Sequence, residues 1–370
     1  MSRIVISAIS LRKGGTLTIL RQCLEYLSQR SAQTGDEIIA LVHRRDLCDY
    51  PNIRYIELPE AISSWGSRLS YEYRKLLPIS EELAPVDLWL SMHDTTPKIK
   101  ARRQAVYCQT SFPFMRWRFR DFRYDPKIPL FALFTRLVYR YRVHHNRYLI
   151  VQQEWLREGL SKLLGVAPER FIVAPPAAPV LELQDRVTHD EAMPYTFLYA
   201  ATPDAHKNFE TLCQASALLE KRVGKGRFRT VLTISGKENK YAQSLYERWG
   251  SCESTVFRGF LSREELRQQY ADTDCMVFPS RIETWGLPLS EFKGYERPML
   301  VSDLPFAHET TSGAKAVAFF PPENAARLSQ LMQEMLEGDT RELHPVPVRS
   351  KGEPTAASWA ELFDLLLAGL

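Results

Sequence analysis

The sequence predicts an α/β fold built from two doubly wound domains, and three observations lead to this prediction. The 370 residues suffice for two domains of ordinary size. Short β-branched runs alternate with helical segments through both halves, which is typical of parallel sheets covered by helices. A proline-rich stretch from about residue 174 to 194 interrupts the alternation, as an extended linker would. We therefore expect domains over residues 1–180 and 195–350, with a last helix over 355–370 that packs back on the first domain.

Each expected strand is a short apolar run bounded by polar or turn residues. In the first half, a strand at RIVISAIS leads through the Gly14-Gly15 turn into a helix, because leucines recur at helical spacing from Leu17 to Leu27. The further strands expected there are EIIALVH, NIRYIEL, VDLWLSM, QAVYCQT and RYLIVQQ. In the second half, the expected strands are YTFLYAA, FRTVLTISG, TVFRGFL, CMVFPS and PMLVSD, with helices at 208–221, at 263–270 and from Pro288 onward.

Composition excludes several classes of protein. With 45% hydrophobic and 25% charged residues, the chain is neither disordered nor fibrous. It has no uninterrupted apolar run of about 18 residues and no secretory pattern at its N-terminus, so we expect a cytoplasmic protein without a membrane span. The six cysteines form no C-x-x-C pair and no histidines gather around them, so neither a disulfide framework nor a metal site is expected.

The two halves differ in charge. Residues 1–180 contain 27 Lys and Arg against 17 Asp and Glu, whereas residues 181–370 contain 21 against 27. The halves therefore carry charges of +10 and −6, although the whole chain carries only +4. This asymmetry indicates domains with different partners, one of which is anionic.

The most informative segment is the loop and helix after the strand CMVF. In parallel sheets, ligands gather at loops that follow the carboxyl ends of strands. Gly286 lets the backbone approach a ligand, Pro288 suits a first helical turn, and the amides around Leu287 form a positive helix end for a phosphate or diphosphate. Glu283 and Glu291 flank that position and could accept hydrogen bonds from a sugar and a ribose. Alternatively, Glu283 is an exposed loop residue and Glu291 interacts only with the helix dipole.

Residues 283–309, ETWGLPLSEFKGYERPMLVSDLPFAHE, resemble the signature of the retaining, nucleotide-sugar-dependent glycosyltransferases of family four. That signature is E-G-F-G-L-P-x-x-E-A-x-A-x-G-x-P-V-I-x-S-D, followed some residues later by E. The chain departs from it at Thr284 and within 292–297, which leaves both acidic residues in place. The resemblance implies a GT-B fold, in which two Rossmann-like domains face each other across a cleft. The shared positions are Glu283, Gly286, Leu287, Pro288, Glu291, Pro298, Ser302, Asp303 and Glu309.

A second stretch, FLYAATPDAHKNFETLCQA, resembles the family's first strand and loop of the second domain. There a basic residue neutralises the donor diphosphate, and the resemblance gives this role to Lys207. The family often has an arginine five or six residues earlier, where this chain has Ala201 and Thr202. The missing charge could come from His206, from Arg281 or from the first domain.

The resemblance also implies roles for other second-domain residues. Gly236 and Phe260 lie in loops that commonly border the base and the phosphates. By the family's pattern, Glu283 orients the sugar, Glu291 holds the nucleoside, and the nucleophile attacks from the leaving-group face. Because Lys207 and the helix end could neutralise the leaving diphosphate, and because no D-x-D motif lies in a suitable loop, no metal ion or other cofactor is expected.

Three first-half residues are candidates because they follow predicted strands. Gly15 lies in the glycine turn expected near the donor phosphate and the acceptor. His93 follows VDLWLSM and is expected to face the cleft, where it could bond the transferred sugar; the alternative is a structural histidine beside a capping Asp94. Gln109 follows QAVYC and either lines the acceptor pocket or belongs to a plain turn.

Residues 112–147 are both basic and aromatic. Nine Lys and Arg face only two Asp, which gives +7 in 36 residues. We expect docking on an anionic membrane surface, with Arg116, Trp117, Arg118 and Arg120 as acceptor or membrane contacts. The same composition could bind nucleic acid, but no nucleic-acid module is present, so none is expected as a partner. A solvated helix face is the third interpretation.

Together these observations predict a retaining hexosyltransferase that moves a sugar from a nucleotide-diphosphate donor to a glycan or lipid-linked acceptor. The expected setting is bacterial surface-polysaccharide or lipopolysaccharide synthesis, as for mannosyltransferases of this kind, at the inner face of the cytoplasmic membrane. Two alternatives remain. A sugar-nucleotide epimerase or dehydrogenase is disfavoured because the first loop lacks G-x-G-x-x-G, and a membrane-associated scaffold would have kept the fold without turnover.

Overall fold

The structure, a computed structural model, describes residues 1–124, 127–176 and 194–369, with the backbone alone for residues 119, 120, 123, 127–131 and 133. The chain divides into two compact units. Unit 1 comprises Met1–Pro113, Leu130–Ala177 and Lys351–Leu370, and unit 2 comprises Phe114–Pro129 and Ala178–Ser350. The prediction of an extended linker at 174–194 falls almost entirely outside the described residues. The division departs from the expected domains because residues 114–129 group with the second sheet.

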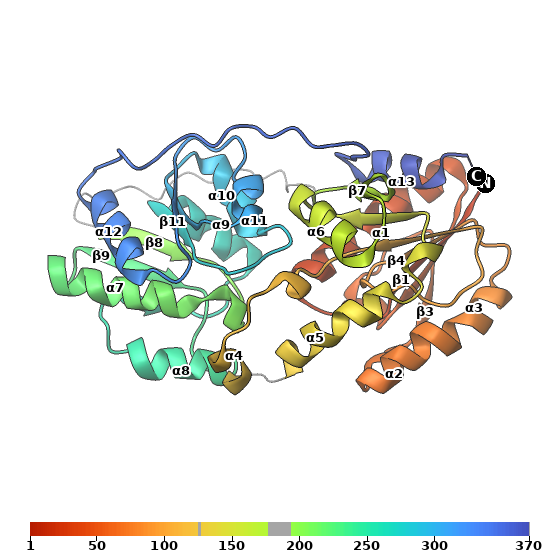
Figure 1. Ribbon diagram of the computed structural model, residues 1–370, viewed down its shortest axis with the longest axis horizontal. Coiled ribbons are helices and arrows are strands. Elements are labelled where there is room, and N and C mark those ends of the chain that lie inside the picture. Colours follow the sequence, from red (N-terminus) through yellow and green to blue (C-terminus); the bar gives the residue numbers. More distant parts are fainter. Residues whose placement is uncertain (125–126, 177–193, 370) are drawn as a thin grey trace. The chain divides into compact units, whose positions relative to one another are not determined.

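In the described part of unit 1, seven parallel strands form one sheet in the order β3-β2-β1-β4-β5-β6-β7 (Figure 1). Every strand expected in the first half is present, and the short β7 is an addition. The strands are β1 (Arg3–Ala8), β2 (Glu37–Val42), β3 (Ile53–Glu57), β4 (Leu88–Ser91), β5 (Arg103–Tyr107), β6 (Tyr148–Val151) and β7 (Phe171–Val173).

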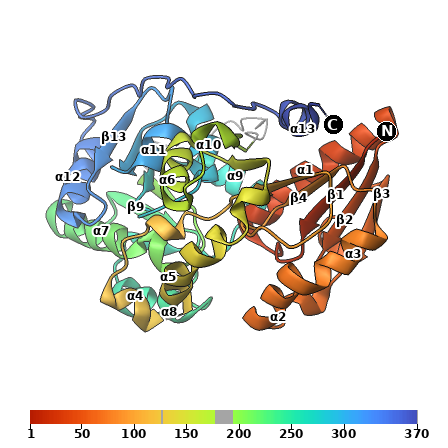
Figure 2. The same ribbon diagram turned by 45° about the vertical axis from the view of Figure 1, so that its right-hand side comes forward.

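Helices cover both faces of this sheet. Successive residues of a strand point to opposite faces, so Ile4 and Ile6 pack in one apolar cluster and Val5 in another. The first cluster includes Phe363 of the C-terminal helix, whose ring stacks on Tyr26 at 5.6 Å between centroids. Figure 2 shows α1 and α13 on one side of the sheet and α2 and α3 on the other. The helices are α1 (Gly14–Thr34), α2 (Trp65–Ser70), α3 (Leu76–Glu82), α5 (Lys127–Arg140), α6 (Glu154–Leu164) and α13 (Trp359–Leu367).

The sheet of unit 2 repeats this topology, with the parallel order β10-β9-β8-β11-β12-β13 among its described residues. Its strands are β8 (Tyr195–Tyr199), β9 (Phe228–Leu232), β10 (Thr255–Phe257), β11 (Cys275–Phe278), β12 (Met299–Ser302) and β13 (Val317–Phe320). Its helices are α4 (Phe119–Tyr124), α7 (Phe209–Val223), α8 (Lys240–Trp249), α9 (Arg263–Ala271), α10 (Leu287–Phe292), α11 (Pro305–Thr310) and α12 (Ala325–Leu336). Of these elements, β13, α4, α8, α11 and α12 were not expected from the sequence.

Local signals fix several helix ends. At the start of α9, Ser262 accepts a hydrogen bond from the Glu265 amide while the Glu265 carboxylate accepts one from the Ser262 amide, which forms a capping box. Asn239 caps α8 by accepting from the Ala242 amide at 2.9 Å. Gly35 ends α1 in the left-handed conformation at φ 73°. These ends set where the following loops begin.

Candidate functional site

The strand order of unit 2 reverses between β8 and β11. Loops that follow the two strands at such a reversal run to opposite sides of the sheet, and the space between them is where open α/β sheets bind ligands. The two loops span residues 200–208 and 279–286. They carry Lys207 and Glu283, so topology alone places these two predicted residues at a ligand-binding position.

A buried polar network fastens the two loops to each other. The Tyr199 hydroxyl lies 2.8 Å from both the Lys207 carbonyl oxygen and Ser280 Oγ; because a phenol has one proton, it donates to the carbonyl and accepts from Ser280. The fully buried Asn208 adopts φ 58° and donates from Nδ2 to the Pro279 carbonyl at 3.0 Å. The backbone that presents Lys207 is therefore held rigidly against the start of the Glu283 loop.

Lys207 and Glu283 form a bidentate ion pair. Lys207 Nζ lies 2.7 Å from Glu283 Oε1 and 2.9 Å from Oε2. The two side chains are 16% and 11% exposed, so they are largely desolvated yet remain within reach of a ligand. A dianionic group that approached Lys207 would compete with Glu283 for the ammonium, and success would release the carboxylate.

Two further side chains stand beside this pair. The Arg281 amide donates to the His206 carbonyl at 2.8 Å, which ties the loop of Glu283 to the turn that precedes Lys207. Burial, together with the positive charge of Lys207, lowers the pKa of His206 to about 3. His206 is therefore neutral at physiological pH and cannot supply the missing cation, whereas Arg281 keeps its charge.

The turn into α10 differs from the expected cluster of free amides. Gly286 adopts φ 92°, which a side chain would strain. The amides of Leu289 and Ser290 both donate to the Gly286 carbonyl, at 3.0 and 3.4 Å, and Pro288 has no N–H. Among residues 287–290, all of them described, the Leu287 amide alone has no partner. The expectation of several unpaired amides here was wrong because the tight turn consumes them.

Glu291 is held inside unit 2, and it forms no ion pair among the residues that the structure describes. Its Oε2 accepts a hydrogen bond from the Tyr270 hydroxyl at 2.9 Å. Burial raises the pKa of Glu291, while the Tyr270 hydrogen bond acts in the opposite direction. The carboxylate is thus oriented by one donor, and its second oxygen is available for another hydrogen bond.

The remaining second-domain candidates lie in loops after β9 and β10. Gly236 adopts φ 88°, and a Cβ there would lie 2.6 Å from Tyr246 Cβ, so the position requires glycine. Its amide donates to the Glu238 carboxylate at 3.0 Å, so this N–H already has an acceptor within the protein. Phe260 is 89% exposed, an orientation that suits stacking on a planar ring.

His93 is placed differently from the expectation. It follows β4 but is 1% exposed, with Nε2 3.2 Å from Ser7 Oγ and Nδ1 3.1 Å from Thr95 Oγ1. The buried Glu72, on the short helix η3 (Tyr71–Lys75), lies 2.9 Å from the same Nδ1. Asp94 accepts hydrogen bonds from the amides of residues 109 and 110. These contacts agree with the alternative, a structural histidine beside a capping aspartate.

The other first-half candidates are also engaged in local structure. Gly15 is exposed in the first turn of α1, which begins at Gly14, so it is not part of a loop. Gln109 is half-buried, and its Nε2 donates to the Met92 carbonyl at 2.7 Å. That bond links the ends of β4 and β5 and fits the interpretation as turn chemistry.

The basic and aromatic stretch is divided between the two units. Residues 114–129 belong to unit 2 and residues from 130 onward to unit 1. In unit 2, Arg118 pairs with Glu323 and Trp117 is half-buried, whereas Arg116 is exposed. The side chain of Arg120 lies outside the described residues. Arg118 thus has an acidic partner from the second half of the chain, and its role as a membrane contact stays a prediction.

Sequence reasoning missed several residues that shape this site. Tyr199 and Asn208 were not singled out. An asparagine at the start of an expected helix is a common capping signal, but here the Asn208 side chain makes no capping hydrogen bond. Asp121 appeared only as a minor opposing charge, yet its carboxylate bonds Arg281 at 2.8 Å. Among residues 1–124, 127–176 and 194–369, no group of three His, Cys, Asp or Glu could hold a metal ion, and no helix is long and apolar enough to cross a membrane.

The chain is similar in sequence to known proteins. Residues 182–346 match the model of the family described as glycosyl transferases group 1. The O-antigen chain mannosyltransferase RfbU of Salmonella typhimurium is 23% identical over 323 residues, which cover 84% of this chain and 85% of that protein.

Solved structures agree on the fold. WaaG, a glycosyltransferase involved in lipopolysaccharide biosynthesis, matches with a TM-score of 0.66 at 14% identity, over 99% of this chain and 100% of the WaaG chain. HepE of Anabaena, in complex with UDP-glucose, matches with a TM-score of 0.63 at 12% identity, over 92% of both chains. These likenesses confirm the predicted GT-B fold.

Proposed function

We propose that this chain, whose residues 182–346 match the family described as glycosyl transferases group 1, is a glycosyltransferase in which unit 2 binds a nucleotide-diphosphate sugar. Its hexose is transferred, with retention of configuration, to a glycan or lipid-linked acceptor. The observation that carries the proposal is the Lys207–Glu283 ion pair at the strand reversal of unit 2. A lysine and a carboxylate held together at that position match the two needs of sugar transfer, a cation for the leaving group and an acceptor for sugar hydroxyls.

Binding of the donor would exchange partners within this pair. The diphosphate carries more negative charge than the Glu283 carboxylate, so it competes successfully for Lys207 Nζ. Lys207 then stabilises the charge that develops on the leaving diphosphate. Glu283, released from the lysine, turns to accept hydrogen bonds from the sugar and so positions its anomeric carbon.

Glu291 and Phe260 complete the proposed donor site. The Glu291 oxygen that Tyr270 leaves available accepts from a ribose hydroxyl, and the exposed Phe260 ring stacks on the base. Retention does not require Glu283 to act as a nucleophile, as a carboxylate does in retaining glycosidases. We propose that the acceptor attacks from the leaving-group face, as in the family that the signature resembles.

The relatives favour a setting in polysaccharide synthesis. RfbU is named as an O-antigen chain mannosyltransferase, and WaaG takes part in lipopolysaccharide biosynthesis. We propose that this chain transfers a hexose, with mannose as the first sugar to test, during assembly of a bacterial surface polysaccharide. HepE binds UDP-glucose, so uridine diphosphate sugars belong in the same screen.

Helix α5 in unit 1 is the surface that we propose for a membrane. Phe134, Leu137 and Tyr141 are 57%, 68% and 55% exposed, and their spacing places them along one side of the helix. Arg136 and Arg140 are exposed beside them. Exposed apolar side chains next to arginines suit an anionic leaflet, so the enzyme would act at the inner face of the cytoplasmic membrane, where a lipid-linked acceptor is available.

The test of the function is the variant Glu283→Ala. Thermal-shift screening against uridine and guanosine diphosphate sugars first identifies the donor, because binding raises the melting temperature. We expect Glu283→Ala to lose sugar transfer while it still binds the donor, since Lys207 remains. The matched control is Glu296→Ala, which removes an exposed carboxylate of the same unit. Unchanged transfer in Glu283→Ala would contradict the proposal, and donor binding without any transfer in the wild type would favour a scaffold.

A further inference from the structure

Residues 114–129 lie far from the second sheet in the sequence but belong to unit 2. Helix α4 of this segment lies beside α8, and the rings of Tyr124 and Tyr241 meet edge to face at 5.1 Å (Figure 1). Arg281 Nη2 donates to Asp121 Oδ1 at 2.8 Å. The side chains of Arg281 and Asp121 are 6% and 3% exposed, so the ion pair is buried. The segment thus brings a carboxylate to the Glu283 loop from a distant part of the chain.

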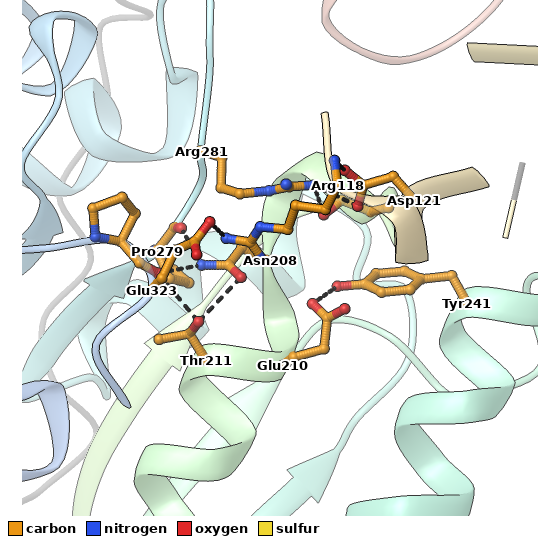
Figure 3. Close-up of polar contacts among 11 residues, drawn as sticks. Arg118, Asp121, Asn208, Glu210, Thr211, Tyr241, Pro279, Arg281 and Glu323 are labelled. Atoms are coloured by element: carbon orange, nitrogen blue, oxygen red, sulfur yellow. Dashed lines mark hydrogen bonds and ion pairs between the residues drawn. The ribbon is translucent and has the colours of Figure 1, made fainter. Parts of the chain in front are cut away.

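The buried cluster around this ion pair has more cationic donors than acceptors. Asp121 Oδ2 accepts from the Arg118 amide at 2.9 Å, and the Arg118 side chain pairs with Glu323 (Figure 3). Three buried guanidinium nitrogens nevertheless have no acceptor: Nε and Nη1 of Arg281 and Nε of Arg118. Buried charged donors without partners cost free energy, and a ligand with several anionic oxygens would satisfy them.

Backbone and side-chain contacts fix Arg281 next to the Lys207 turn. Its Nη2 also donates to the Ala205 carbonyl at 3.2 Å, and its amide donates to the His206 carbonyl. Arg281 stands two residues before Glu283 in the same loop. The guanidinium and the Lys207 ammonium are therefore held by the same two loops at the strand reversal.

A pocket gives access to this cluster from within unit 2. It has a volume of about 190 Å³ and lies between α4 and the turns after β8 and β9. Asp121 and His206 line it together with the aromatic rings of Trp117, Tyr124 and Tyr241. The pocket therefore reaches the Asp121 carboxylate of the ion pair, whereas Arg281 and Lys207 are not among the residues that line it.

Resting on the proposed function, we infer that Arg281 is the second phosphate-binding cation of the donor site, and that Asp121 is a positioning residue that holds it until a diphosphate arrives. Arg281 thereby takes the role of the arginine that the resemblance places five or six residues before Lys207, where this chain has Ala201 and Thr202. The guanidinium fork binds phosphate oxygens in a bidentate manner, and a diphosphate offers more charge than the single carboxylate it displaces.

The test uses inorganic pyrophosphate, which lacks a base and a sugar, and measures its dissociation constant by titration calorimetry on the full chain. We expect Asp121→Asn to bind pyrophosphate several-fold more tightly, because the competing charge is removed while the size and shape of the side chain are kept. Arg281→Met is expected to weaken binding about tenfold, the effect of losing one charge-assisted interaction. Arg341→Met, which removes an arginine paired on the surface of the same unit, is the matched control and is expected to change little.

The outcomes separate this inference from the proposed function. The role of Arg281 would be overturned if a folded Asp121→Asn bound pyrophosphate no more tightly than the wild type, or if Arg281→Met bound it as well as the control does. The proposed function would still stand in that case, provided that sugar transfer depends on Glu283. If Arg281→Met does not fold, Arg281→Lys and Asp121→Asn decide, since both retain a cation. Wild-type chain that does not bind pyrophosphate would overturn the donor site itself. A purely structural ion pair predicts loss of stability in Asp121→Asn without tighter binding.

Discussion

Replacing Glu283 with glutamine should move three properties in different directions. The substitution keeps the shape of the side chain but leaves Lys207 Nζ without the carboxylate that lies 2.7 and 2.9 Å away. Donor-diphosphate binding should strengthen, because the ammonium no longer has to be taken from Glu283. Sugar transfer should fall, because glutamine accepts hydrogen bonds from sugar hydroxyls more weakly than a carboxylate. Stability should decrease, because a largely buried cation loses its partner.

The magnitudes follow from the geometry of the pair. Two charges about 2.8 Å apart attract each other by about 6 kcal/mol at an effective dielectric constant of about 20, before desolvation is counted. Removal of one partner of a fully buried pair costs about 3–5 kcal/mol. Lys207 and Glu283 keep 16% and 11% of their exposure, so we expect about 2 kcal/mol here. For a domain of this size that is a fall of roughly 4–8 °C in Tm.

Calorimetry with pyrophosphate and with the donor, a transfer assay and thermal unfolding measure the three effects on one protein preparation. We expect binding up to about tenfold tighter, equivalent to about 1.4 kcal/mol, together with transfer reduced by about a hundredfold. Glu296→Gln is the control for the loss of an acidic side chain in unit 2. Weaker diphosphate binding in Glu283→Gln than in the wild type would refute the exchange of partners on which the mechanism rests.

Three further substitutions test other parts of the structure. The pKa of His206 in the folded state is lowered to about 3, so the neutral ring stabilises the fold above about pH 6.5, and this contribution is lost as the pH falls toward 3. Between pH 7 and pH 5, urea unfolding should show that the wild type loses up to about 2 kcal/mol more stability than His206→Gln. Equal losses in the two proteins would disprove the contribution of His206. Gly286→Ala should cost about 1–2 kcal/mol because φ is 92°. Gly66→Ala in α2, where a Cβ would meet only Ser64 Oγ at 3.8 Å, should be neutral or slightly stabilising, and equal unfolding midpoints of the two variants would show that Gly286 is not strained. Phe363→Ala should destabilise unit 1 by about 3–4 kcal/mol, since the ring is fully buried against Tyr26, and an unchanged Tm would mean that α13 does not hold the fold.

The regular elements were predictable because their signals are local. Buried parallel strands are apolar on both faces, so runs such as EIIALV and CMVF can be predicted as strands from their own residues alone. The resemblance assigned Lys207 and Glu283 to one donor site, and the structure brings the two side chains together as an ion pair. Their roles toward a donor stay predictions. The C-terminal helix was found from its apolar face and lies against α1 as predicted.

What the sequence concealed depends on contacts between distant residues. The Asp121–Arg281 pair joins positions 160 residues apart, so nothing near Asp121 indicates that it leaves its neighbours for unit 2. His93 looked exposed at a strand end, but the buried carboxylate of Glu72 comes from another element. The amides near Leu287 looked available until the Gly286 carbonyl was seen to accept two of them. In each case the fold brings a partner into contact that spacing along the chain does not indicate.

The central claim is that Lys207 binds the diphosphate of a nucleotide-sugar donor, and a thermal-shift panel tests it most directly. Uridine and guanosine diphosphate sugars are added at millimolar concentration to wild type, Lys207→Met and Lys315→Met, the last of which removes an exposed lysine of the same unit. The account predicts that at least one donor raises the Tm of the wild type and of Lys315→Met, with the rise abolished or much reduced in Lys207→Met. A panel that stabilises none of the proteins, or stabilises Lys207→Met as much as the wild type, would contradict it.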